Sequence, residues 1–214
     1  MDKDFARLLQ NTLLWLPEYG YGYLKPNVNF KYDNNYIDKF KQYEKLERTV
    51  HLNNLRVNLV NEYIGKEGWL LDFGCGCGTF IKQRGDNTFG YDVALETCMW
   101  LRENKLEFDP ICSTFIDNIC FWDSLEHVNE PDSILNQILN YAFISMPVYK
   151  NGESVLKSKH YKPNEHIYYF TIEGLIRFME MKHFTCVKHL DLEGQIGREE
   201  IETFVFRRNG KEHA

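Results

Sequence analysis

The chain has 214 residues, a formal net charge of −6 and a hydrophobic content of 43%. This length suits one domain with a well-buried core, and the composition is that of a soluble globular protein. Because it has no dense run of lysine and arginine and no apolar run near the ~20 residues of a membrane span, the sequence disfavours nucleic-acid partners and excludes a membrane-spanning helix.

The first 64 residues are predicted to form a helical and aromatic cap, or lid, over the rest of the domain. Apolar residues at helical spacing predict a short amphipathic helix over residues 2–15, which Pro17 ends. Residues 18–36 carry six aromatic side chains; these rings either stack on a ligand or staple the cap to the core, and we favour stapling. One or two helices are predicted over residues 38–63, where Arg56 lies.

Residues 69–93 predict a strand, a glycine turn, a short helix and a second strand. An apolar run ends at Asp72, and glycines then occupy every second position from Gly74 to Gly78, where the backbone must turn sharply and let a ligand approach. The dinucleotide fingerprint requires glycine or alanine where this chain has Thr79, and Asp72 would place negative charge beside a pyrophosphate. The stretch therefore favours a cationic ligand.

This stretch resembles motif I of the class I S-adenosylmethionine (SAM)-dependent methyltransferases, which here reads Asp72-Phe73-Gly74-Cys75-Gly76-Cys77-Gly78. The resemblance implies that SAM, which carries a sulfonium and an ammonium but no phosphate, binds at the glycine turn and leaves as S-adenosyl-L-homocysteine. It also implies that Asp92 accepts hydrogen bonds from the ribose hydroxyls and that Arg56 reaches the methionine carboxylate, although for Arg56 we favour the alternative of a solvated helix face. The predicted cofactor residues are Asp72, Phe73, Gly74, Cys75, Gly76, Gly78, Asp92, Val93, Ser113, Trp122 and Arg56.

The alternation of short strands and helices predicts an α/β fold, a Rossmann-like doubly wound and mostly parallel sheet, within a single domain whose core spans 65–208. Further strands are predicted over 108–114, 116–121 and 141–148, and an antiparallel edge hairpin over 187–192 and 203–207. Many methyltransferases place an acidic residue after the third strand to meet adenine. This chain has Ser113-Thr114-Phe115 there, so the backbone or the Ser113 hydroxyl is expected to take that role.

The block Trp122-Asp123-Ser124-Leu125-Glu126-His127-Val128 follows the strand predicted over 116–121. It resembles the fourth-strand motif of ubiquinone-biosynthesis O-methyltransferases, a small-molecule branch of the family. The resemblance implies that Phe121 and Trp122 border the methionine end of SAM, because ligands of open α/β sheets lie beyond the carboxyl ends of the strands. Glu126 and His127 either act at that edge or form a hydrogen-bonded helix start, and the sequence leaves both interpretations open.

An insertion over 149–170 carries many side chains that donate, accept or stack, and in this fold it is placed to cover the methyl donor. Histidine suits the removal of a proton from an acceptor near neutral pH. The catalytic candidates are therefore His127, His160 and His166, with Glu165 to orient or stabilise one of them. A metal site at these side chains is the alternative, but methyl transfer itself requires no metal, so we predict none.

The sequence as a whole predicts a SAM-dependent methyltransferase, of the EC 2.1.1 class, that acts on an O or N nucleophile of a small molecule. A tRNA or DNA methyltransferase is one alternative, although Trp122-Asp123-Ser124-Leu125 stands where amino-methylating DNA enzymes carry an Asp/Asn/Ser-Pro-Pro-Tyr/Phe motif. A non-catalytic SAM-binding module is another. The six cysteines lack the spacing of zinc sites and the acidic start lacks a signal-peptide pattern, so we expect a cytoplasmic protein; the oligomeric state stays open.

Overall fold

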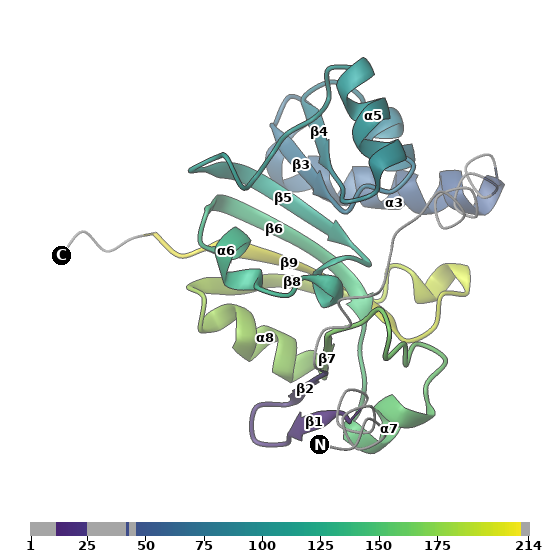
Figure 1. Ribbon diagram of the computed structural model, residues 1–214, viewed down its shortest axis with the longest axis vertical. Helices are drawn as coiled ribbons and strands as arrows, with labels where there is room; N and C mark the ends of the chain where they lie inside the picture. Colours follow the sequence, from purple (N-terminus) through teal and green to yellow (C-terminus); the bar gives the residue numbers. More distant parts are fainter. Residues whose placement is uncertain (1–11, 25–41, 43–45, 211–214) are drawn as a thin grey trace, which may run out of the picture.

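The computed structural model describes residues 12–24, 42 and 46–210. Its centre is a six-stranded sheet in the order β4-β3-β5-β6-β9-β8 (Figure 1). Strands β4, β3, β5 and β6 run parallel, whereas β9 pairs antiparallel with both β6 and β8. This arrangement confirms the predicted fold class, a Rossmann-like and mostly parallel sheet with an antiparallel edge hairpin.

The strands of this sheet are β3 (Leu70–Phe73), β4 (Thr88–Tyr91), β5 (Ile116–Trp122), β6 (Ile138–Pro147), β8 (Phe184–Leu190) and β9 (Ile201–Arg208). A smaller antiparallel sheet consists of β1 (Leu14–Leu16), β2 (Tyr21–Tyr23) and β7 (Tyr168–Phe170). The helices are α3 (Glu47–Ile64), α4 (Thr79–Arg84), α5 (Leu95–Glu103), α6 (Pro131–Leu135), α7 (Gly152–Lys157) and α8 (Ile172–Glu180), with short 3-10 turns η1 (Leu125–His127) and η2 (Gly194–Ile196).

The central strands divide their side chains between two cores, because successive residues of a strand point to opposite faces of the sheet. Leu71 and Phe121 lie in one core with residues of α6 and α8. Their neighbours Leu70 and Cys120 lie in the other core with residues of α3 and α4. Helices therefore cover both faces, and the carboxyl ends of β3, β4 and β5 meet at one edge of the sheet.

Two helices begin with favourable end chemistry. The Thr171 side chain caps α8 by accepting the N–H of Gly174 at 2.9 Å, and Pro131 occupies the first turn of α6, where its missing N–H is tolerated. Leu175, Phe178 and Met179 of α8 are buried, so that helix closes one core next to β8.

The strand predicted over residues 108–114 is not formed. The chain pairs with β4 only at Glu107, through an isolated bridge. Asp109 then accepts the N–H of Ile111 at 2.8 Å in a turn, and Pro110 has no N–H with which to continue a ladder. The turn chemistry outweighs the apolar pattern on which the prediction rested, so β4 is the edge strand of the sheet.

The helix predicted over residues 2–15 is wrong at its end, because Leu14–Leu16 form the strand β1. Residues 1–11 and 25–36 lie outside the described part of the chain. Strand β2 pairs with β7 of the insertion, and the Tyr21 ring packs 5.5 Å from that of Phe170 and 6.0 Å from that of Phe178, between centroids. Pairing of β1 with β2, whose other edge joins β7, overrides helical propensity here, and Tyr21 staples the N-terminal hairpin to the core.

The helical stretch predicted over residues 38–63 is described from Glu47 on, as the single helix α3. None of the described helices combines the length and the apolar character that a membrane span requires.

Candidate cofactor and active site

Three glycines of the loop after β3 adopt left-handed backbone conformations, with φ of 78° at Gly74, 55° at Gly76 and 70° at Gly78. A Cβ atom on Gly74 would lie 2.7 Å from that of Ser124, and one on Gly78 would lie 2.3 Å from the Trp100 ring. A Cβ on Gly76 would meet nothing within 4 Å. Two glycines therefore allow close packing, whereas Gly76 leaves its backbone open to a ligand.

Asp92, at the end of β4, holds this loop in place. Its Oδ2 atom accepts the N–H of Gly76 at 2.8 Å, and its Oδ1 atom accepts the N–H of Ala94 at 2.9 Å. Thr97 adds a bond from its hydroxyl to the Gly76 carbonyl at 2.7 Å. Each carboxylate oxygen keeps a second lone pair, so each can still accept a hydrogen bond from a ribose hydroxyl, as predicted.

Asp72 ends β3 as a buried carboxyl group, 2% exposed. Its Oδ1 atom lies 3.5 Å from Sγ of Cys120, a weak donor. Burial outweighs both this contact and the attraction of Arg56, and it raises the pKa of Asp72 to about 7. A cationic ligand at the carboxyl edge would restore the ionised form, which fits the sulfonium and ammonium of SAM.

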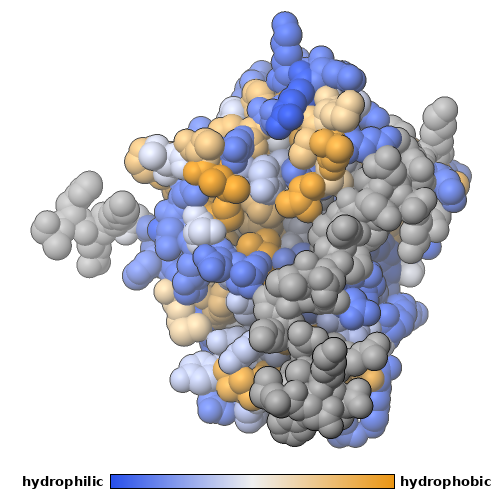
Figure 2. All heavy atoms as spheres, in the orientation of Figure 1, coloured by the Kyte–Doolittle hydropathy of each residue, from blue (hydrophilic) through white to orange (hydrophobic). Residues whose placement is uncertain are grey.

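Apolar side chains are exposed beyond Asp92. Val93 is 64% exposed, and Figure 2 shows apolar atoms in the upper half of the view, where Figure 1 has β3, β4 and α5. Such a surface fits a flat apolar group like an adenine ring. Ser113 lies in the loop that replaces the predicted strand, and its hydroxyl donates to the Phe115 carbonyl at 3.0 Å, so that proton is already used.

Two predicted cofactor residues of the loop point into the protein. Cys75 approaches Gly90 closely, since a Cβ built there would lie 2.9 Å from its Sγ atom, and burial raises the pKa of the Cys75 thiol. The Phe73 ring lies 4.8 Å from the Tyr91 ring and 5.3 Å from the Phe121 ring, between centroids. Their side chains support the loop, and only their backbone can face a ligand.

Arg56 belongs to a network of four charged side chains, in which Arg56 and Glu193 are buried and Asp123 and Arg198 are partly exposed. Its Nε atom donates to Glu193 at 2.9 Å, and its Nη2 atom contacts Glu193 and lies 3.3 Å from Asp123. Arg198 donates to both oxygens of Asp123 at 3.0 and 2.9 Å and also pairs with Glu193. The alternative of a solvated face for Arg56 is therefore wrong, and this network ties α3 to the end of β5 and to the loop after β8.

The network fixes the charge of its members. Burial alone would favour the neutral form of Asp123, but Arg198 and Arg56 outweigh it and lower the pKa of that carboxyl. Burial is likewise outweighed at Arg198, whose pKa is raised by Asp123 and Glu193. The Arg56 guanidinium also lies 4.8 Å from the centroid of the Trp122 ring, which is 8% exposed at the end of β5.

The 3-10 turn η1 lies directly against the glycine loop. The Ser124 hydroxyl donates to the Phe73 carbonyl at 2.6 Å, and η1 begins at the next residue. The turn brings Glu126 and His127 next to His166 of the insertion, with 4.7 Å between the two ring centroids and the rings nearly perpendicular. Two of the four predicted catalytic residues are thus brought together.

Burial keeps this cluster uncharged. It raises the pKa of Glu126 to about 8, with Asp123 adding to the shift. It lowers the pKa of His166 to about 2, helped by the neighbouring His127, whose own pKa is also lowered by burial. At neutral pH both imidazoles therefore carry a lone pair, and Glu126 is largely protonated.

The other two catalytic candidates have different positions from those expected. Nε2 of His160 lies 3.2 Å from the Glu199 carbonyl oxygen, away from the paired histidines. The Glu165 carboxylate lies 3.4 Å from Nζ of Lys162, and it is the Glu165 carbonyl oxygen that lies 3.0 Å from Nδ1 of His127. Glu165 can therefore orient His127 through its backbone.

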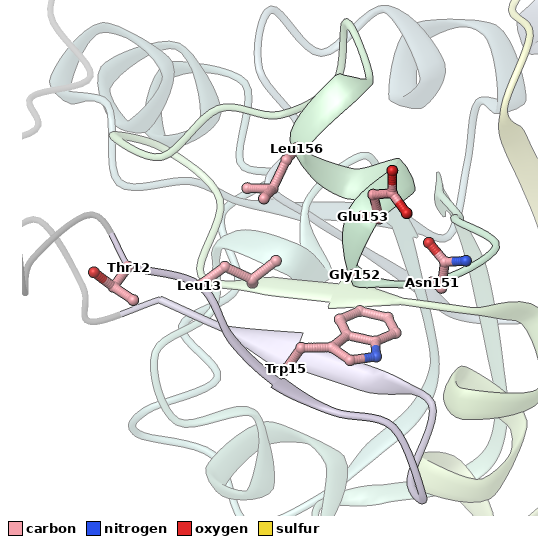
Figure 3. A pocket seen from close by; sticks show the side chains of 7 residues that line it. All are labelled: Thr12, Leu13, Trp15, Asn151, Gly152, Glu153 and Leu156. Carbon is pink, nitrogen blue, oxygen red and sulfur yellow. The ribbon is translucent and has the colours of Figure 1, made fainter.

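A separate hollow of about 550 Å³ lies between the N-terminal hairpin and α7 (Figure 3). Trp15 forms its floor beside Gly152, where an added Cβ would come within 2.7 Å of the indole. The lining residues are Thr12, Leu13, Trp15, Asn151, Gly152, Glu153 and Leu156. None of them belongs to the glycine loop or to the histidine cluster.

A family model described as a methyltransferase domain matches residues 43–189. The chain belongs to this methyltransferase family. The match includes the glycine loop, Asp92 and the η1 turn, and with the fold it confirms the predicted class, a class I SAM-dependent methyltransferase, and the predicted cofactor, SAM. A comparison with curated proteins gave no match.

Solved structures of methyltransferases share the fold of this member of the family. Magnesium protoporphyrin IX methyltransferase from Synechocystis PCC 6803, with bound SAH, is 14% identical at a TM-score of 0.57, over 82% of this chain and 95% of that chain. A SAM-dependent methyltransferase from Clostridium acetobutylicum is 14% identical at a TM-score of 0.57, and the match covers 83% of this chain and 100% of that chain. A methyltransferase in complex with the Haloferax volcanii Trm112 methyltransferase activator is 13% identical at a TM-score of 0.60, and the match covers 84% of this chain and 99% of that chain.

Proposed function

We propose that this methyltransferase transfers the methyl group of SAM to an O or N nucleophile of a small molecule. The observation that carries the proposal is the pairing of a buried carboxyl group, Asp72, with an open glycine backbone at Gly76, at the edge where His127 of η1 meets His166, both of them uncharged. The first pair suits a cationic methyl donor. The second suits a small acceptor that must be activated while water is kept out.

Different residues of this chain have different proposed roles in binding and transfer. Asp72, Gly76 and Asp92 are the proposed holders of SAM, with Val93 against the adenine. SAM supplies a methyl group on a good leaving group, so the remaining task is to hold the acceptor in line with the methyl carbon. His127 and His166 are the proposed activating pair, and Glu165 orients His127 through its carbonyl. His160 no longer belongs to this proposal.

Two finer assignments are also part of the proposal. The Leu125-to-Val128 string supports a place in the small-molecule branch that includes ubiquinone-biosynthesis O-methyltransferases. The net charge of −6 and the lack of a basic run favour a small molecule over a nucleic acid. We further propose a cytoplasmic protein, in which the β1-β2 hairpin belongs to the cap predicted over residues 1–64, whereas α3, whose Leu59 and Val60 pack inside the domain, belongs to the core.

The test is transfer of radiolabelled methyl groups from SAM, catalysed by the purified chain, to a small-molecule extract, to bulk tRNA and to DNA. We expect label in the small-molecule fraction and a loss of at least tenfold in the His127→Gln variant. The matched control is His189→Gln, because His189 lies outside the cluster, 2.9 Å from Glu202. Label confined to tRNA or DNA would contradict the proposed substrate class, and SAM binding without transfer to any fraction would favour a non-catalytic module.

A further inference from the structure

Three side chains with metal-binding chemistry converge at the η1 turn. Glu126, His127 and His166 each offer one ligand atom, and these atoms all lie within 4.8 Å of one another. The first two come from η1 and the third from the turn before β7, so residues distant in sequence form the cluster. A carboxylate with two imidazoles is a frequent donor set for zinc and other first-row divalent ions.

Within residues 12–24, 42 and 46–210, the carboxyl group of Glu126 has no hydrogen-bond partner. Glu126 is 1% exposed, and in the described part of the chain neither of its side-chain oxygens forms a hydrogen bond. A buried polar group without a partner costs free energy, so its retention indicates a ligand that supplies the missing interaction. A cation held between this carboxylate and two imidazoles would supply it.

The His127 ring is oriented as a metal ligand is. Its Nδ1 atom lies 3.0 Å from the Glu165 carbonyl oxygen, which can only accept, so Nδ1 carries the proton and Nε2 carries the lone pair. Histidine ligands commonly donate their other ring N–H to a backbone carbonyl, which fixes the tautomer and the ring. Glu165 therefore has the role of a positioning residue through its backbone.

The ligand atoms lie close enough together to hold one ion. Zinc binds nitrogen and oxygen at about 2.0–2.2 Å, so its ligand atoms lie roughly 3.3–4 Å apart. The cluster, at up to 4.8 Å, closes onto an ion by side-chain movements of about 1 Å. The buried Tyr169 ring lies 5.8 Å from the His166 ring, between centroids, and Tyr149 packs on Tyr169, so aromatic rings support His166.

We infer that Glu126, His127 and His166 bind one divalent transition-metal ion, such as Zn²⁺, and that this ion activates a hydroxyl acceptor. The inference rests on the proposed methyl transfer from SAM to a small molecule. It changes one step of that proposal, because the bound ion, and not a histidine, activates the acceptor. It also revises the sequence-based prediction of no metal. The acceptor O–H loses its proton to solvent because a bound cation lowers its pKa. The oxygen then bonds to the methyl carbon while the carbon–sulfur bond breaks, and sulfur keeps that electron pair as a neutral thioether.

The test is calorimetric titration of the chelator-treated full chain with Zn²⁺, together with Co²⁺ titration followed by visible absorption. We expect one ion per chain, and binding at least tenfold weaker in Glu126→Gln and His166→Gln. His189→Gln is the matched control, since His189 also faces a carboxylate, at 2.9 Å from Glu202, but in a pair of two residues. SAM binding, measured on every variant, reports whether its fold is retained.

Two results of the metal titrations would overturn the inference. One is a Zn²⁺ affinity of the wild-type protein that is no higher than that of Glu126→Gln, or a visible spectrum of Co²⁺ that remains the spectrum of the aqueous ion when the protein is added. The other is a His189→Gln variant that loses as much affinity as His166→Gln. If the metal-free chain binds SAM and transfers its methyl group, the metal inference is wrong and the proposed function stands. If the chain binds one ion but no SAM, the metal site stands and the proposed function is wrong.

Discussion

The carboxylate of Asp92 accepts the backbone N–H of Gly76 at 2.8 Å and thereby joins the ends of two neighbouring parallel strands. The interaction links the glycine loop after β3 to the end of β4, sixteen positions further along the chain. It gives Asp92 a structural role in the free protein in addition to its proposed contacts with ribose.

Substitution of Asp92 therefore has two separable effects. Asp92→Asn keeps one acceptor oxygen but loses the charge and the second acceptor, so we expect a loss of about 1–2 kcal/mol in stability from weaker bonds to Gly76 and Ala94. SAM affinity should fall by at least tenfold. Chemical denaturation and SAM titration measure the two effects, and unchanged values in both would contradict the role assigned to Asp92.

Gly76→Ala is best compared with Gly85→Ala, a substitution at a glycine outside the loop. Both glycines have positive φ, 55° and 85°, and a Cβ on either would meet nothing within 4 Å. Both variants should lose stability from backbone strain, Gly76→Ala by about 1–2 kcal/mol and Gly85→Ala by more, because a φ of 85° with a ψ of −143° is a conformation that essentially only glycine adopts. Only Gly76→Ala should weaken SAM binding, by tenfold or more. Equal SAM affinities in the two variants would show that no ligand approaches Gly76.

Asp72 predicts an unusual dependence of stability on pH in the SAM-free protein. Its pKa is raised by burial from 3.8 to about 7, so between these values the folded chain keeps a proton that the unfolded chain has lost. Its contribution to stability therefore falls as pH rises from about 4 to 7. Asp72→Asn lacks this titration. The unfolding free energy of Asp72→Asn minus that of the wild type should therefore rise by about 2–3 kcal/mol between pH 5 and 7.5. Denaturation of both proteins at each pH measures this difference. A difference that stays constant with pH would contradict a raised pKa of the buried Asp72 carboxyl group.

Arg56 should be far more important for stability than a surface arginine. Arg56→Ala leaves Glu193, which is fully buried, with one cation fewer, and we expect a loss of about 3–5 kcal/mol. Arg102→Ala is the control, because Arg102 pairs with Glu107 in an exposed ion pair, and the loss of such a pair should change stability far less. Denaturant unfolding of both variants makes the comparison, and similar losses would refute the account of the network.

The parts that could be predicted from sequence are those governed by local rules. The apolar run to Asp72 and the glycine spacing each act within a few residues, and each lies where it was expected. The strand over 108–114 failed for a local reason that was overlooked, since Asp109 and Pro110 favour a turn.

The charged network and the metal-binding cluster could not be predicted, because they depend on contacts between distant parts of the chain. Glu193 and Arg198 follow β8 in a connecting segment that no motif marks, and they reach α3 only in the folded protein. Glu126 was visible beside His127, but its lack of a hydrogen-bond partner is a property of the fold. His160 looked equivalent to His166 in sequence, yet its ring faces Glu199.

Calorimetric titration of the purified chain with SAM, and with S-adenosylhomocysteine, tests the central claim most directly. The account predicts saturable binding of both at one site per chain, with affinity reduced at least tenfold in Gly76→Ala and unchanged in Gly85→Ala. No saturable binding of either compound at millimolar concentration would contradict it.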